Sequence, residues 1–139
     1  MTTLADLKTL IEIIEETYEF MLAYAAQGLE GDEGNKSAGQ LRDFLVKADE
    51  ATVKLAPEFR ALVDSEGLTP ADKYNAFIDV IEQDAKAASA GLQLVLAQSA
   101  IGSQLIDNMN ASIHLRALLT DLFLIDEIVK RALAQHKGP

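Results

Sequence analysis

His114 and Arg116 are the side chains of this sequence whose types and spacing could best do chemistry. They lie two residues apart in SIHLRALLTD, a segment that we predict to be helical. An exposed histidine on a helical bundle, with a base nearby, can accept and pass on a phosphoryl group. Such sites generally keep a small residue one turn after the histidine, and this sequence has Leu118 there. We favour a histidine at a helix surface or interface. The alternative is a phosphotransfer-type or other small helical-bundle enzyme that uses His114.

Four glutamates form the densest group of carboxylates in the sequence: Glu12, Glu15, Glu16 and Glu19. Carboxylate-bridged iron sites in helical bundles need inward-facing glutamates and a Glu-x-x-His motif, because iron takes imidazole as well as carboxylate ligands. Neither histidine of the chain has a glutamate three residues before it. The glutamates also lie away from the stripe of Leu and Ile on the same predicted helix. We therefore expect a solvated helix face, with no metal site and no cofactor.

The segment from Ala87 to Ile106, AASAGLQLVLAQSAIGSQLI, contains no charged residue. A helix that faces solvent normally carries a charge about once per turn, so this segment is expected to be covered by the rest of the fold or by another chain. Its small and uncharged polar residues would let helices approach closely and hydrogen-bond across a seam. The predicted interaction surface consists of Ala87, Gly91, Gln98, Ser99, Gly102 and Ser103. The segment is long enough to cross a bilayer, but Ser and Gln are spread along it, and we predict no membrane span.

Length and composition limit the class of protein. A chain of 139 residues that is 49% hydrophobic is expected to form a single domain over residues 1–139. It contains no cysteine, which fits a cytoplasmic protein. The net charge is −10, and an acidic surface of this kind repels phosphates. We therefore expect no nucleic-acid partner and no binding to anionic membranes.

Hydrophobic periodicity predicts helices throughout the chain and no strand. The first is expected over residues 4–27, with Thr3 and Asp6 as a capping box. A glycine-rich acidic loop follows over residues 28–36, and a second helix is expected from residue 37. Pro57 is expected to end or kink that helix and to open a short helix that closes at Gly67.

Thr69 and Pro70 read as the cap and first residue of a long helix that ends or bends near Gly102. A last helix is expected from Asn108 or Asn110 to residue 135. It is apolar nearly all round, which predicts a central position in the bundle. The fold class is therefore all-α: an antiparallel bundle of four long helices and one short helix.

The sequence favours a non-enzymatic, cytoplasmic protein-interaction module, such as an adaptor, a chaperone or a regulatory subunit. It would act through the uncharged helical surface, and the surplus of apolar surface indicates that it forms a homodimer. Besides the enzyme that uses His114, a second alternative is a bundle that binds an apolar small molecule between its helices.

Overall fold

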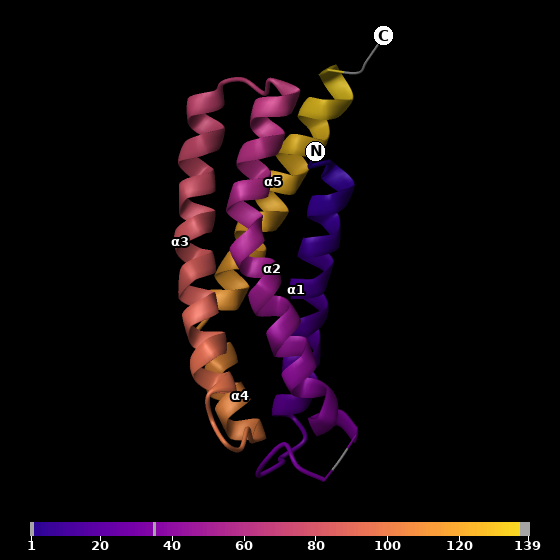
Figure 1. Ribbon diagram of the computed structural model, residues 1–139, viewed down its shortest axis with the longest axis vertical. Coiled ribbons are helices and arrows are strands. Elements are labelled where there is room, and N and C mark those ends of the chain that lie inside the picture. Colours follow the sequence, from indigo (N-terminus) through magenta and orange to yellow (C-terminus); the bar gives the residue numbers. More distant parts are fainter. Residues whose placement is uncertain (1, 35, 137–139) are drawn as a thin grey trace.

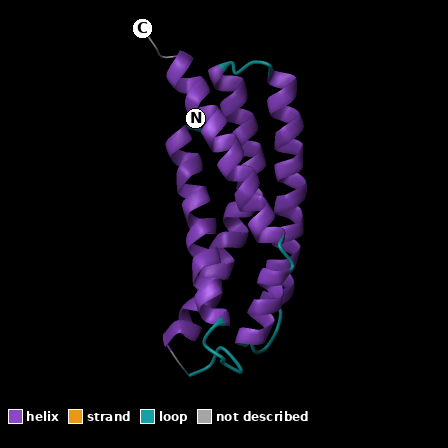
Figure 2. Ribbon diagram, turned by 180° about the vertical axis from the view of Figure 1, so that it is seen from behind, coloured by secondary structure: helices purple, strands orange, loops and turns teal. Residues whose placement is uncertain are grey.

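The computed structural model describes residues 2–34 and 36–136, and these residues form five helices. They are α1 (Leu4–Ala25), α2 (Lys36–Glu66), α3 (Ala71–Leu96), α4 (Ser103–Ala111) and α5 (His114–His136). The long helices run alternately up and down (Figure 1), and the described residues contain no strand (Figure 2). The predicted all-α bundle of four long helices and one short helix is confirmed.

The helices pack as neighbours around one core: α1 against α2, α2 against α3, and α5 against α3 and α1. The connection over residues 67–70 lies at the end of the bundle that holds both chain ends (Figure 1). The loop over residues 26–34, the loop over residues 97–102, and α4 lie at the opposite end. The largest fully buried side chains are Tyr24, Phe59, Leu7, Ile14, Met21, Leu41, Leu45, Leu55, Leu62, Ile78, Ile81 and Leu92.

The predicted capping box at the start of α1 is confirmed. The Thr3 hydroxyl accepts a hydrogen bond from the Asp6 amide at 3.2 Å, and the Asp6 carboxylate accepts one from the Thr3 amide at 2.9 Å. These bonds satisfy two of the amides that lack helical partners at a helix N-terminus, so this boundary is set by local sequence alone.

The predicted end of a helix at Pro57 is wrong, because α2 continues through Pro57 to Glu66. A proline inside a helix removes one backbone hydrogen bond and costs about 3 kcal/mol. Ala56 and Phe59 beside it are buried in the core, and burial of such side chains offsets that cost. Pro57 and Val53 lie on the exposed face, where water can hydrogen-bond to the carbonyl that lacks the proline N–H. The short helix of the bundle is therefore α4, and the segment after Pro57 belongs to α2.

The boundaries of the last three helices also differ from the prediction. Pro70 is the N-cap of α3 in an extended conformation, and the Thr69 side chain makes no capping hydrogen bond. The uncharged segment is no single helix: α3 ends at Leu96, and residues 97–102 form a loop before α4. The last helix begins at His114, directly after Ile113, which has a positive φ of 63°. The boundaries around α4 lie where this helix packs against α1, a contact between segments far apart in the sequence that local signals do not reveal.

Candidate functional site

An apolar groove lies between the first turns of α3 and the second half of α5. Its volume is about 330 Å³, and hydrophobic side chains form most of its wall. Its lining residues are Pro70, Lys73, Tyr74, Phe77, Leu124, Ile125 and Ile128. We call this feature the α3–α5 groove. Tyr74 and Phe77 are half-buried, whereas Leu124 and Ile128 are 52% and 44% exposed.

The groove exists because α5 has more apolar residues than the core can hold. Leu118, Leu122, Ile125 and Val129 fill the core, and other large side chains of α5 remain outside it. Phe123, for example, is 50% exposed on a different part of the α5 surface. The predicted central position of α5 is therefore wrong. Scattered exposed apolar residues are ordinary, but a concave apolar surface between two helices is typical of a binding site.

Two carboxylates face each other next to the groove, Asp84 on α3 and Asp121 on α5. Both side chains are partly buried. Burial, together with the hydrogen bond and the negative charge of Asp84, raises the pKa of Asp121 to about 7. A carboxyl with a pKa of about 7 is partly protonated near neutral pH, so Asp121 carries a proton in part of the molecules there. Within the described residues, no Lys or Arg forms an ion pair with either carboxylate.

Three residues of the predicted interaction surface contact other parts of this chain. A Cβ atom on Gly91 would lie 2.9 Å from the Met109 side chain, and one on Gly102 would lie 2.8 Å from the Glu30 carbonyl oxygen. The buried Ser103 hydroxyl donates to the Tyr24 carbonyl at 2.7 Å and accepts from an amide of the loop after α1 at 2.9 Å. The small residues therefore allow α3, α4 and the loop after α1 to pack closely.

The other three residues of the predicted interaction surface lie in the loop after α3 and on α3 itself. Gln98 and Ser99 are exposed side chains in the loop after α3, and Ala87 is half-buried on α3. The Gln98 and Ser99 carbonyls accept hydrogen bonds from Arg42, at 2.8 and 3.4 Å. Together the six residues span α3, the following loop and α4, and they form no continuous exposed face.

Arg42 joins two loops, after α1 and after α3, and no local pattern in the sequence predicts this contact. Its guanidinium donates to Asp32 in the loop after α1 and to the Leu96 carbonyl at 3.1 Å. The second oxygen of Asp32 accepts from the Ile101 amide at 2.9 Å. The hydrogen bonds from Arg42 and the Ile101 amide hold the pKa of Asp32 below its usual range. A cation at the last carbonyls of α3 also complements the helix dipole, which explains how this uncharged helix end is stabilised.

His114 and Arg116 are both exposed at the start of α5. Arg116 lines a small surface pocket with Ile113, Ala117, Thr120 and Asp121. Leu118, one turn after His114, is fully buried. His114 is therefore accessible to a partner, as a phosphoryl-accepting role would require.

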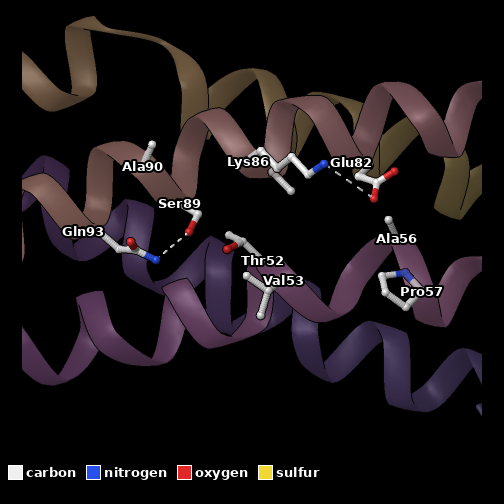
Figure 3. A pocket seen from close by; sticks show the side chains of 10 residues that line it. Thr52, Val53, Ala56, Pro57, Glu82, Lys86, Ser89, Ala90 and Gln93 are labelled. Atoms are coloured by element: carbon white, nitrogen blue, oxygen red, sulfur yellow. Dashed lines mark hydrogen bonds and ion pairs between the residues drawn. The ribbon is translucent and has the colours of Figure 1, made fainter.

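A second cleft, of about 290 Å³, lies between α2 and α3 (Figure 3). Small side chains such as Ala56, Ser89 and Ala90 leave this space open. Two of its polar side chains are already hydrogen-bonded: Ser89 donates to Asp49, which lies outside the cleft, and Gln93 donates to Ser89 at 3.2 Å. The cleft could accept a small ligand with both apolar and polar parts.

The glutamate cluster on α1 stays on the surface, with Glu15 half-buried and its three neighbours exposed. In the described part of the chain, no group of three or more His, Asp or Glu side chains is arranged to hold a metal ion. Likewise, none of the helices described is both long enough and apolar enough to cross a membrane.

Comparison of the chain with protein-family models, with curated proteins and with solved structures finds no match.

Proposed function

We propose that this protein is a non-enzymatic interaction module and that the α3–α5 groove is its binding surface. The observation that carries the proposal is an apolar, concave surface on which Leu124 and Ile128 remain about half exposed. A groove between two helices is the usual acceptor for the apolar face of a helix from a partner protein. The chain would thus act as an adaptor, a chaperone or a regulatory subunit.

The proposal differs from the sequence prediction in the position of the surface. The uncharged residues 87–106 contribute mainly to contacts within the chain, whereas the groove lies at the opposite end of α3. Homodimer formation stays a prediction, and native mass spectrometry of the full chain measures it. A cytoplasmic location belongs to the same proposal and is supported by the absence of cysteine.

The test places a photo-crosslinking amino acid at Tyr74, inside the groove, or at Leu94, which is 67% exposed on α3 outside it. A protein that crosslinks only from position 74 is identified, purified and titrated against variants of the full chain. The double variant Leu124→Asp/Ile128→Asp should weaken binding by at least about tenfold, because a charge in the groove loses its hydration on binding. Leu94→Asp is the matched control and should bind like wild type. Equal binding by the groove variant and the control would refute the proposal.

A phosphotransfer role remains a second candidate because His114 is exposed, as that chemistry requires. Incubation with radiolabelled acetyl phosphate should label the wild-type chain and leave His114→Gln unlabelled if this alternative holds. Equal labelling of both chains, or of neither, would exclude it.

Small-molecule binding is a third candidate, supported by the cleft between α2 and α3. Ala90→Trp would fill that cleft from its exposed side. This alternative predicts that a ligand retained through purification is present with the wild-type chain and absent from the variant.

A further inference from the structure

We infer that the partner segment is an amphipathic helix with two large apolar side chains in the α3–α5 groove and a lysine or arginine between Asp84 and Asp121. The inference rests on the proposed function and adds the chemistry of the partner to it. It depends on the position of the two carboxylates relative to the groove and on the charge of the chain.

We call the groove together with the acidic pair the seam, because helix spacing places the pair next to the residues that line the groove. Asp121 lies three residues before Leu124 and four before Ile125, and residues at these spacings are neighbours on a helix surface. Asp84 lies seven residues, or two turns, after Phe77 on the same side of α3. Because α3 and α5 run antiparallel (Figure 1), the pairing of Asp84 with Asp121 places both carboxylates at the same end of the groove.

Among the residues that the structure describes, no lysine or arginine forms an ion pair with Asp84 or Asp121. Burial is the main reason why the pKa of Asp121 is raised to about 7, and a hydrogen bond to Asp84 and repulsion by its negative charge raise this pKa further. A lysine or arginine from a partner would stabilise the ionised form of Asp121 and offset its repulsion by Asp84. A neutral or acidic side chain at this position would leave the repulsion in place.

The whole-chain charge also selects a basic partner over a second copy. Each chain carries a net charge of −10, so a second copy approaches this groove with like charge. Lys73 lines the groove at the end away from the acidic pair, so a symmetric dimer that packed groove on groove would set only one positive charge of each copy against the two carboxylates of the other, while the net charges of the two chains oppose association. A basic amphipathic helix meets the same surface with opposite charge and is attracted to it at long range.

The test uses the full chain, labelled with ¹⁵N, and three synthetic helical peptides as probes. The first carries leucine at positions i and i+4 and lysine at i+8, which matches the apolar and acidic parts of the seam. The second has glutamate in place of the lysine. The third has the composition of the first, with its leucines moved off one face. Chemical-shift changes of the amides locate the binding site, and their concentration dependence gives Kd.

The lysine peptide should shift amides over residues 70–84 and 121–128 and bind about tenfold tighter than the glutamate peptide. The double variant Asp84→Asn/Asp121→Asn should remove that preference. Its matched control is Asp72→Asn/Glu127→Gln, which removes two exposed negative charges from the same helices outside the seam. The control should retain most of the preference. Thermal unfolding checks that each variant folds. If Asp84→Asn/Asp121→Asn does not fold, the single variant Asp84→Asn replaces it in the titrations.

The possible results separate this inference from the proposed function. In one outcome, Leu124→Asp/Ile128→Asp abolishes binding of both charged peptides, but Asp84→Asn/Asp121→Asn still prefers the lysine peptide. The groove would then be the binding surface, and the inferred lysine or arginine between the carboxylates would be wrong. If no peptide shifts amides of the groove, or if the third peptide binds as well as the first, both are wrong. If the chain alone is a dimer that Leu124→Asp/Ile128→Asp dissociates, the occupant is a second copy and the inference is overturned.

Discussion

Replacement of Arg42 by alanine should lower the free energy of unfolding by about 2–3 kcal/mol. Its guanidinium makes hydrogen bonds to Asp32 and to the carbonyls of Leu96 and Gln98. The Asp32 side chain is only 8% exposed, so removal of its partner leaves a nearly buried carboxylate without its cation. Loss of one partner of a buried pair costs about 3–5 kcal/mol. Because the Arg42 side chain is itself 35% exposed, water compensates for part of that cost.

Arg60→Ala is the matched control for this measurement. Arg60 also contacts two carboxylates, Asp79 at 2.7 Å and Glu82 at 3.0 Å, but their side chains are 67% and 40% exposed. Exposed ion pairs contribute about 0–1 kcal/mol, so Arg60→Ala should change stability by less than about 1 kcal/mol. Urea unfolding followed by circular dichroism gives both values, provided that the slope with denaturant stays constant.

The pH dependence provides an independent check. The pKa of Asp32 is lowered in the folded state, so its contribution to stability is present above its usual pKa of about 4 and is lost as pH falls through the lower, folded value. The stability difference between wild type and Arg42→Ala should therefore shrink in acid below about pH 4. Equal effects of the two arginine substitutions at neutral pH would refute the reasoning about burial.

Three further substitutions test other parts of the structure by the same unfolding assay. Gly102→Ala should destabilise the chain by about 1–3 kcal/mol, because its Cβ would lie 2.8 Å from the Glu30 carbonyl oxygen; an unchanged midpoint would contradict this close approach. Asp121→Asn should raise stability by about 1–2 kcal/mol at about pH 8 and have little effect at about pH 4. The pKa of Asp121 is raised to about 7 in the folded chain, so its ionisation beside Asp84 removes stability as pH rises from about 4 through 7. The asparagine side chain of the variant cannot ionise and avoids this loss. A variant less stable than wild type at about pH 8 would contradict this. Pro57→Ala should stabilise the chain by about 1–2 kcal/mol, because alanine restores a helical hydrogen bond while the unfolded chain gains entropy; a lower stability would show that the proline relieves a strained helix.

The features predicted correctly from the sequence are those that depend on residues close together in the chain. The Thr3 and Asp6 side chains act within four residues of each other, so their capping box could be recognised without knowledge of the fold. The periodicity of Leu and Ile predicted α1 almost to its ends for the same reason. Pro57 shows the limit of local rules, because the buried residues on both sides of it decide the course of α2.

The candidate site depended on contacts between distant residues, which the sequence could not reveal. The absence of charge over residues 87–106 indicated that the segment is covered, but only the structure identifies α4 and the loop after α1 as neighbours of Gly91 and Gly102. The surplus of apolar residues on α5 was visible in the sequence. The sequence did not show that these residues lie beside Tyr74 and Phe77, or that Asp84 lies beside Asp121. Both contacts follow from the antiparallel packing of α3 and α5.

The hydrogen bonds of Tyr24 and Ser103 have a consequence for the order of folding. The Tyr24 hydroxyl donates to the Ile101 carbonyl at 2.7 Å, and Ser103 donates to the Tyr24 carbonyl, across separations of 77 and 79 residues. By contrast, α1 with α2 and α2 with α3 form hairpins between helices adjacent in sequence, which need little loop closure. The end of the bundle that holds α4 should therefore close last, after the transition state. Ser103→Ala should accelerate unfolding and leave the folding rate nearly unchanged in stopped-flow measurements.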